Sequence, residues 1–233
     1  MYICEKCGKS FPKQNGLGGH MNIHRSENIE LTELQEQMIL GSLLGDMWIY
    51  KNGHSGLNPE LGVKHSTNQR DYIMWKYEML RDIARGFPKE FAGSGYGEGT
   101  TMVAFHSKSL PCLIPIYNAT HPDGNKCVTK EWVDMISHPI SIATWFMDDG
   151  CRHNKNQFSF ALGRTEQDAC DLLQSFMIDR WDINTVIYTH VGKSGSRGVV
   201  QKYLHTNTKD SVKLKELIEP YVIPSMRYKI GVL

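Results

Sequence analysis

The chain has 233 residues, of which 40% are hydrophobic and 22% are charged, a composition that suits a globular protein with a sizeable core. No apolar stretch approaches the roughly 18 residues of a membrane span, and the N-terminal MYICEKCGKS lacks the apolar core of a signal peptide. We therefore expect an intracellular protein, in a bacterial or phage-infected cytoplasm or an organelle matrix. The net charge is only +1, so any nucleic-acid partner must be bound by local arrangement of charge.

The first thirty residues contain a metal-binding pattern with the spacing Cys-x2-Cys-x12-His-x3-His, made by Cys4, Cys7, His20 and His24. Phe11 and Leu17 fall where such a module needs its small apolar core. Two thiolates and two imidazoles complete a tetrahedral Zn²⁺ shell, and a module this small folds only with the metal. The spacing predicts a C2H2 zinc finger of ββα type over residues 1–27. The plainer alternative, reduced cysteines and surface histidines, does not account for the spacing and the core together.

The helix of this finger carries few side chains that could read a base. Counting back from His20, the positions that normally contact bases hold Lys13, Gly16 and Gly19. Glycine has no side chain, which leaves Lys13 to contact a guanine or a phosphate. We expect the finger to anchor the protein on DNA more than to read its sequence. The other cysteines form no CxxC pair and are expected to be packing thiols: Cys112, Cys127, Cys151 and Cys170.

A helix is predicted after the short polar linker that follows the finger. Thr32 and Gln35 form a capping box, and apolar residues run from there through Leu44. The helix is expected to end at Asp46, just before the strand-like MWIYK.

A second segment, SIATWFMDDG, has the same plan. Pro139 suits a first helical position, and Gly150 is expected to close the helix as a left-handed residue. Asp148 and Asp149 precede that glycine, although acids at a helix C-terminus are disfavoured by about 0.3–1 kcal/mol. We therefore expect a cation at this helix end, and a divalent metal ion is the candidate.

A lysine follows each acid at the same distance, since Lys126 lies eighty residues after Asp46 and Lys229 lies eighty residues after Asp149. Between acid and lysine, both segments have the same order of elements. A β-like stretch (62–66, 157–162) precedes an amphipathic helix (68–83, 165–181), a glycine-containing hairpin (93–107, 186–206) and a closing helix (109–118, 209–221). Self-similarity at about 100 residues predicts a duplicated α+β fold with a pseudo-two-fold axis and halves at 28–138 and 139–233.

The segments ILGSLLGDM and IATWFMDDG, with their lysines and the C-terminal PSMRYKI, resemble the LAGLIDADG homing endonucleases, specifically the single-chain, double-motif branch. The resemblance covers about residues 31–233 and not the finger. It implies an αββαββα fold in each half, with the two motif helices packed side by side. Small residues that allow close helix approach support this independently: Gly41, Ser42, Gly45, Ala143 and Thr144.

The resemblance further implies that Asp46 and Asp149 meet at the adjoining helix ends. Two carboxylates there suit a divalent cation with oxygen ligands, Mg²⁺ or Mn²⁺. Gly45 and Asp148, next to these acids, are candidate further ligands, Asp148 through its backbone carbonyl or as a secondary ligand.

The reaction implied is hydrolysis of one phosphodiester on each strand of double-stranded DNA, across the minor groove, leaving 3′ overhangs. A bound metal ion lowers the pKa of a water and neutralises charge on the leaving oxygen. Lys126 and Lys229 correspond to the family's active-site lysines, one for each strand. Either acid alone is as easily a solvated surface group, but two acids with matched lysines favour an active site. Because one chain has both motifs, we expect a monomer.

DNA recognition is expected from residues that project from two sheets into the major groove at a long target site. Individually, each candidate is as easily a solvated strand residue. The candidates in the body are Lys51, His54, Lys64, Ser66, Arg152, Asn154, Lys155, Gln157, Lys193, Arg197, Gln201 and Lys202, with Lys13 in the finger.

Two other functions stay open. LAGLIDADG proteins sometimes act as RNA maturases that assist splicing of their own intron, so intron RNA is a second candidate partner. A non-catalytic DNA-binding regulator is the third possibility, although the intact acids and lysines favour the nuclease. An intein is not expected, because the C-terminal IGVL lacks the His-Asn junction that protein splicing needs.

Overall fold

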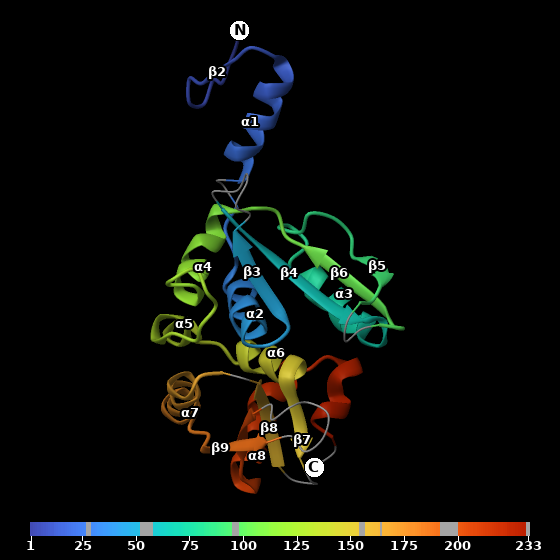
Figure 1. Ribbon diagram of the computed structural model, residues 1–233, viewed down its shortest axis with the longest axis vertical. Helices are drawn as coiled ribbons and strands as arrows, with labels where there is room; N and C mark the ends of the chain where they lie inside the picture. The colour runs from blue at the N-terminus through green and yellow to red at the C-terminus, as the bar shows by residue number, and fades with distance from the viewer. Residues whose placement is uncertain are drawn as a thin grey trace.

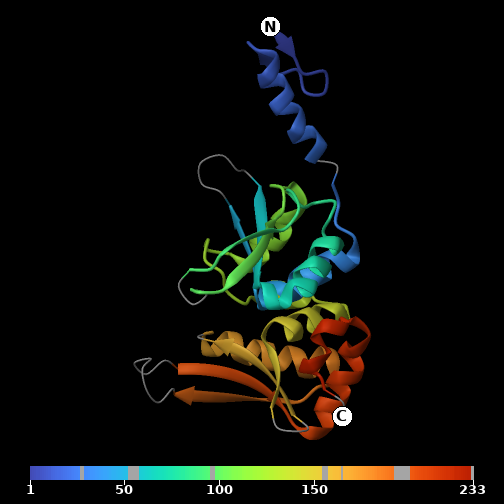
Figure 2. The same ribbon diagram turned by 90° about the vertical axis from the view of Figure 1, so that its right-hand side faces the viewer.

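The computed structural model describes residues 1–26, 29–51, 58–94, 98–153, 157–163, 165–191 and 200–231, with side chains described in these ranges except at 22–26. A small N-terminal unit and two larger halves follow one another along the long axis (Figures 1 and 2). No helix within the described ranges is long and apolar enough to cross a membrane.

The N-terminal unit has the predicted ββα order. Strands β1 (Tyr2–Ile3) and β2 (Ser10–Phe11) pair antiparallel, and helix α1 (Gln14–Ser26) follows them. Cys4 is buried, and the ring centroids of Phe11 and His20 lie 4.8 Å apart. The predicted core residue Phe11 therefore packs beside one of the predicted zinc ligands.

The first half is built on an antiparallel sheet of order β3-β4-β6-β5. Its elements are α2 (Glu33–Leu44), β3 (Met47–Lys51), β4 (Pro59–Ser66), the 3₁₀ turn η1 (Thr67–Gln69), α3 (Arg70–Met79), β5 (Lys89–Ala92), β6 (Thr101–His106), η3 (Pro111–Leu113), α4 (Ile114–Thr120) and α5 (Lys130–Met135). The predicted capping box is confirmed, because Thr32 and Gln35 each accept a hydrogen bond from the other's backbone N–H.

The second half repeats this plan with the sheet order β7-β8-β10-β9. Its elements are α6 (Pro139–Asp149), β7 (Gly150–His153), β8 (Gln157–Gly163), α7 (Gln167–Trp181), β9 (Thr185–Val191), β10 (Val200–Thr206), α8 (Thr208–Ile218), η4 (Glu219–Tyr221) and η5 (Pro224–Lys229). The predicted duplicated αββαββα fold of the α+β class is confirmed. The boundaries expected after residues 27 and 138 stay predictions, and helix α5 was not anticipated.

Helices α2 and α6 pack directly against each other at the junction of the halves (Figure 1). A Cβ atom on Gly41 would lie 2.0 Å from the carbonyl oxygen of Ser141 and 2.4 Å from Oγ1 of Thr144. A Cβ atom on Gly45 would lie 2.4 Å from Cβ of Asp148. The close approach predicted from small residues is present, and it depends on Gly41 in α2 and on Gly45 directly after it.

Polar side chains tie the same two helices together. Gln37 of α2 accepts hydrogen bonds from the backbone N–H groups of Ser137 and His138 and from the hydroxyl of Ser141. Its amide nitrogen donates to the carbonyl oxygen of Met135 at 2.8 Å. Gln37 is 3% exposed. From the first half of the molecule it therefore provides a buried hydrogen-bond acceptor for polar groups at and just before the start of α6.

The prediction that Gly150 closes α6 in a left-handed conformation is wrong. Gly150 has φ −79° and ψ 148°, which is extended backbone, and it is the first residue of β7. Glycine is needed there for space, because a Cβ atom would lie 2.3 Å from the Phe146 ring and 2.4 Å from its carbonyl oxygen. The helix therefore leads into the strand without a turn.

A substitution at the helix junction tests this packing. We expect Gly41→Ala to lower the free energy of unfolding by about 1–3 kcal/mol or more, because its methyl group would overlap backbone atoms of α6. Gly86→Ala is the matched control, because nothing lies within 4 Å of a Cβ atom there and its φ is not positive. Denaturant titration of both variants provides the measurement, and equal stabilities would contradict the packing described.

Candidate active site

The two motif acids lie at the C-terminal ends of α2 and α6. Helix α2 ends at Leu44, and the N–H of Gly45 donates to the carbonyl oxygen of Ser42 at 3.1 Å. Asp46 follows in the turn before β3, with 43% of its side chain exposed. Asp149 is itself the last residue of α6 and is half-buried.

The acids disfavour each other's ionisation. Burial, and after it the negative charges of Asp46 and Asp148, raise the pKa of Asp149 to about 7, against the opposing charges of Lys229 and Lys126. Burial and the charge of Asp148 also raise the pKa of Asp46, because the surrounding protein displaces water even though part of the side chain is exposed. Carboxylates in this situation are stabilised by a bound cation.

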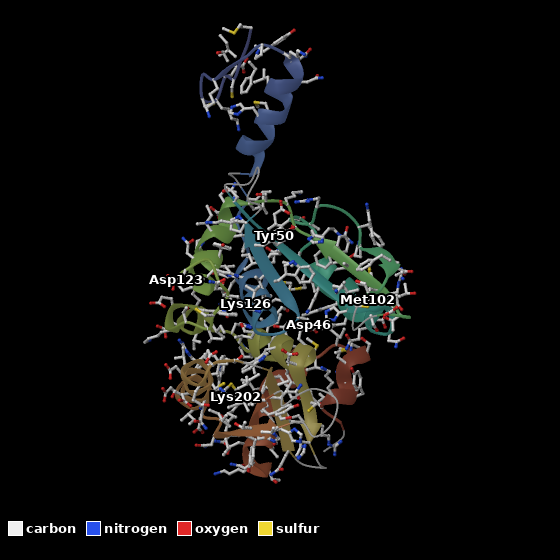
Figure 3. All side chains as sticks on the ribbon, viewed as in Figure 1. Asp46, Tyr50, Met102, Asp123, Lys126 and Lys202 are labelled. Atoms are coloured by element: carbon white, nitrogen blue, oxygen red, sulfur yellow. The ribbon has the colours of Figure 1, made fainter. Side chains whose placement is uncertain are left out.

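The predicted lysines lie within the same electrostatic neighbourhood. Lys126 is exposed in the segment between α4 and α5 (Figure 3), with its Nζ 5.9 Å from the centre of the Trp132 ring. Nζ of Lys229, at the end of η5, donates to the carbonyl oxygens of Met147 (2.6 Å) and Asp148 (2.8 Å). Desolvation by the surrounding protein lowers the pKa of both lysines, although the Lys126 side chain is exposed, and the acids of the site oppose this effect.

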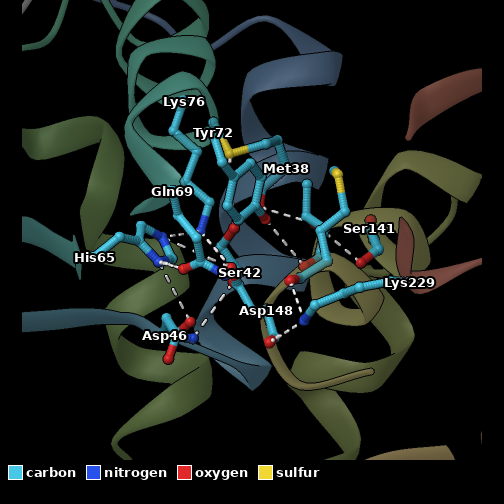
Figure 4. A network of polar contacts seen from close by, with 12 residues as sticks. Met38, Ser42, Asp46, His65, Gln69, Tyr72, Lys76, Ser141, Asp148 and Lys229 are labelled. Carbon is cyan, nitrogen blue, oxygen red and sulfur yellow. Dashed lines mark hydrogen bonds and ion pairs between the residues drawn. The ribbon is translucent and has the colours of Figure 1, made fainter. Parts of the chain in front are cut away.

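Beside Asp46 lies a buried group of side chains that we call the seam network, made by His65, Lys76 and Asp148 (Figure 4). Neither Lys76 nor Asp148 has any exposed side-chain surface, and Lys76 Nζ lies 2.6 Å from Asp148 Oδ1. Lys76 Nζ also lies 3.3 Å from His65 Nε2 and 4.4 Å from the centre of the Tyr72 ring. The other carboxylate oxygen of Asp148 accepts the backbone N–H of Asp46 at 3.3 Å.

His65 is a neutral imidazole in this network. Burial, and after it the charge of Lys76, lower the pKa of His65 to about 4. Because Nε2 accepts from Lys76, Nδ1 carries the proton and donates to Oε1 of Gln69 at 3.0 Å. Nδ1 also lies 3.6 Å from Oδ2 of Asp46, so the imidazole packs against the acid without carrying a charge.

The contacts of Asp148 bear on its predicted role as a metal ligand. Ligand atoms of Asp46, His65 and Asp148 lie within 4.8 Å of one another. However, the Asp148 carboxylate is engaged by Lys76 and by the N–H of Asp46, and its carbonyl oxygen accepts from Lys229. Metal ligation by Gly45, Asp46, Asp148 and Asp149 stays a prediction.

Lys76 and Lys229 therefore supply part of the positive charge at the end of α6. Lys76 and His65 were not predicted from the sequence, although one signal was present. Lys76 falls on the apolar face of its helix, three residues after Ile73 and four residues before Leu80, and all three are buried. A lysine on such a face indicates a buried anionic partner.

A cavity of about 550 Å³ lies beside Asp149. Lys126 contributes to its wall together with Trp145, Leu162 and Leu173. The space next to Asp149 is thus mostly apolar, whereas the space next to Asp46 is occupied by the seam network.

The N-terminal unit contains a second metal-ligating cluster. Ligand atoms of Cys4, Cys7 and His20 lie within 4.8 Å of one another, and Cys7 Sγ lies 3.0 Å from His20 Nε2. Burial opposes ionisation of Cys4, but hydrogen bonds from the Cys7 and Lys6 backbone and from the Cys7 and His20 side chains together lower the pKa of its thiol to about 6. A thiolate beside a thiol and an imidazole fits Zn²⁺. The predicted fourth ligand, His24, lies outside the described side chains.

The outer face of the second sheet contains a cleft of about 700 Å³. Two predicted DNA contacts, Gln157 and Gln201, line it. The sequence analysis missed the aromatic and imidazole side chains that line it with them: His153, Tyr188, His190, Tyr203 and His205. This face combines hydrogen-bonding groups with flat rings.

Arg152 and Lys202 were also predicted to contact DNA, but they do not line this cleft. Arg152 pairs across the sheet with the buried Phe158, which places it on the helix-covered face. Lys202 lies two residues before the buried Leu204, next to a register shift, and its Nζ donates to the carbonyl oxygen of Thr165 at 2.8 Å. Neighbours in the strand alternate between faces, and the sequence pattern did not reveal which face was outward.

The remaining candidates are dispersed. Lys64 is exposed on β4, Ser66 accepts the N–H of Asn68 at the start of η1, and Lys13 is exposed before α1. Nζ of Lys51 lies 4.4 Å from the centre of the Tyr117 ring. Five candidates lie outside the described residues: His54, Asn154, Lys155, Lys193 and Arg197.

Comparison with known proteins agrees with this geometry. The model of the LAGLIDADG DNA endonuclease family matches residues 36–213, which is most of the chain. The chain belongs to the LAGLIDADG DNA endonuclease family. A C2H2-type zinc finger model matches residues 1–27, so this LAGLIDADG protein carries an N-terminal finger.

Individual relatives extend the comparison. The solved structure of the homing endonuclease I-WcaI bound to its DNA recognition sequence has the same fold, with a TM-score of 0.77 and 18% identity over 98% of this chain and 97% of that chain. Protein RecA of Mycolicibacterium chitae is 28% identical over 88% of this chain and 48% of that protein. The cytochrome b mRNA maturase bI2 of Debaryomyces hansenii is 22% identical over 84% of this chain and 72% of that protein. The chain thus spans about half the length of the RecA proteins that it matches.

Zinc binding by the finger can be tested directly. We expect the purified chain to contain about one Zn²⁺, and we expect Cys4→Ala to lose it, because three ligands bind structural zinc far more weakly than four. Cys112→Ala is the control, since that half-buried thiol lies in the first half. Mass spectrometry of metal content provides the measurement. Full zinc content in the Cys4→Ala variant would place the metal elsewhere.

Proposed function

We propose that this protein is a site-specific endonuclease that hydrolyses one phosphodiester on each strand of double-stranded DNA. The observation that carries the proposal is the pair of acids, Asp46 and Asp149, at the ends of two packed helices with pKa values raised by burial and by neighbouring negative charge. Membership of the LAGLIDADG DNA endonuclease family supports the same reaction.

The donor set fits a divalent cation of the Mg²⁺ or Mn²⁺ type. Asp46 and Asp149 offer hard oxygen ligands, and the pKa of each carboxyl, raised first by burial and then by neighbouring negative charge, supports a bound cation at this place. When bound, the cation supplies a water of lowered pKa and neutralises charge on the leaving oxygen.

The lysines would act on the phosphate and the water. Lys229 uses two of its three N–H groups on the carbonyl oxygens at the end of α6, so one N–H remains to bind a phosphate oxygen. Lys126 makes no comparable carbonyl contact in the described residues and can move towards the scissile phosphate. Each would stabilise the negative charge that develops at phosphorus, and the helix-bound Lys229 is the more rigid of the two.

DNA would lie across the outer faces of both sheets, with the acids at its centre. The cleft of the second sheet offers Gln157 and Gln201 for base edges and rings for stacking against sugars. One chain supplies both acids, so a monomer is sufficient for cleavage of both strands. The finger would add phosphate contacts beyond one end of the body, where it lies in Figure 2.

Substitution of the acids tests the reaction. We expect Asp46→Asn and Asp149→Asn each to reduce double-strand cleavage in Mg²⁺ by at least about 100-fold, because each removes a charged metal ligand. Binding to the same DNA should change little, since the outer sheet faces are untouched. A target selected by wild-type cleavage of a randomised library serves as substrate. Asp123→Asn is the control, because that exposed acid lies just before Lys126 (Figure 3).

Loss of cleavage in all three variants would indicate a general defect and not a role of the motif acids. Wild-type rates in Asp46→Asn or Asp149→Asn would remove the proposal, because no other pair of acids lies at the ends of the packed helices in the described residues.

The similarity to a cytochrome b mRNA maturase favours one further candidate, an RNA-binding splicing cofactor. The two functions separate in a single variant. An Asp46→Asn/Asp149→Asn chain that still promotes splicing of an intron RNA would have a maturase function that is independent of cleavage. If neither the wild-type chain nor the double variant promotes splicing, the protein is not a maturase for that intron.

The finger's contribution is tested by removing residues 1–27. We expect DNA affinity to fall about 10- to 100-fold and the salt dependence of binding to flatten, because a tethered module adds phosphate contacts at high effective concentration. The cut positions should stay the same, since Asp46 and Asp149 set them. Footprinting and cleavage mapping provide the measurement. Unchanged affinity would assign the finger another partner, and altered cut positions would make it a sequence reader.

A further inference from the structure

The two halves differ beside their motif acids, and the sheet register identifies which residues are equivalent. The residue that follows each acid pairs with Val63 in β4 and with Phe160 in β8. Two residues further along, β4 has His65, which is 3% exposed, and β8 has Leu162, which is 8% exposed. A polar side chain in the first half thus corresponds to an apolar side chain in the second.

The other two positions of the seam network also differ between the halves. Eleven residues after His65 and Leu162 stand Lys76 in α3 and Leu173 in α7, and both are buried. The residue before each motif acid is Gly45, directly after α2, and Asp148 in α6. Within the described residues, a seam network therefore exists only beside Asp46.

The second half leaves the corresponding space open. Leu162 and Leu173, the counterparts of His65 and Lys76, line the cavity beside Asp149. Gly45 has no side chain that could extend into the second half as Asp148 extends into the first. Within the described residues, no side chain of α2 or of the turn after it therefore contacts the backbone N–H of Asp149.

Stability alone does not explain the network. A buried ion pair contributes little net stability compared with apolar residues of similar size, because desolvation offsets the attraction. The same fold forms around Asp149 with Leu162 and Leu173 of the second half and Gly45 of the first half at these positions. We therefore relate the difference between the halves to how each motif acid is held in position.

Asp46 is an acid whose position needs support. It lies outside its helix, after a glycine, and glycine gives the backbone additional freedom at this turn. Asp149 is still within α6, so its backbone is fixed by the helix itself. Asp148 accepts the N–H of Asp46, and Lys76 holds the Asp148 carboxylate in the orientation that this contact needs.

We propose that Asp148, held by Lys76, is a positioning residue that fixes Asp46 for cleavage of one DNA strand, and that it has no equivalent role for Asp149. This rests on the proposed endonuclease function. The two strands are accordingly cut by centres of unequal construction, and loss of the contact to Asp46 slows one strand more than the other.

Two double variants isolate this contact. Lys76→Met/Asp148→Asn and Lys76→Met/Asp148→Ala both remove the ion pair, so neither leaves an unpaired buried charge. Asparagine retains an oxygen that can accept the N–H of Asp46, whereas alanine does not. Both keep a Cβ atom against Gly45, which preserves the helix contact. We measure single-turnover cleavage of each strand on a duplex with both strands labelled, together with the melting temperature.

We expect Lys76→Met/Asp148→Ala to slow one strand at least about tenfold more than the other and to accumulate nicked DNA, because small displacements of a catalytic group have large effects on rate. The asparagine variant should keep the wild-type ratio of strand rates. Melting temperatures of the two variants should agree within about 5 °C. Equal slowing of both strands, or the same strand ratio in both variants, would overturn the proposal.

A measurement on the unmodified chain keeps the proposal testable if a variant does not fold. We expect the Asp46 amide to be protected from hydrogen exchange by a factor of at least about 100, because it donates to a buried carboxylate. Exchange at the rate of an open turn would overturn the proposal. If the wild-type chain cleaves no DNA, the proposed function fails, while the exchange measurement still tests the contact itself.

Discussion

The close contact of α2 and α6 is the constraint on which the rest of the structure depends. Gly41 and Gly45 let the two backbones meet, and this contact brings the C-terminal ends of both helices to one place. Each end carries a partial negative charge and a carboxylate, so the arrangement concentrates negative charge at the centre of the molecule. Positive charge at this place is therefore needed for the structure itself.

The cations that the structure contains are divided between two tasks. Lys229 neutralises the end of α6 through carbonyl oxygens, and Lys76 neutralises the one carboxylate that is fully buried. Neither compensates Asp46 and Asp149 completely, since burial and neighbouring negative charge still raise the pKa values of both. The uncompensated negative charge lies at Asp46 and Asp149, where a metal ion and a DNA phosphate would bind under the proposed function.

The sequence predicted those parts of the structure that depend on local pattern and spacing. The capping box at Thr32, the duplicated order of elements and the small residues of the helix junction all appear in the structure. Gly150 was misinterpreted because a glycine after a helix can serve either a left-handed turn or a close contact, and only the position of Phe146 distinguishes them. Lys76 was missed because its partner Asp148 lies 72 residues away and on the other half.

The same long-range contacts explain how a duplicated chain can give its halves different properties. His65 and Lys76 in one half and two leucines in the other fill equivalent buried positions, so the fold accepts either. Their effects on a neighbouring acid are not equivalent, because only the polar set can hold a backbone N–H in place. Under the proposed function the chain acts on two strands of different sequence, and its two halves need not be identical. The presence of His65 and Lys76 where the second half has Leu162 and Leu173 shows that the halves diverge in the buried surroundings of the motif acids.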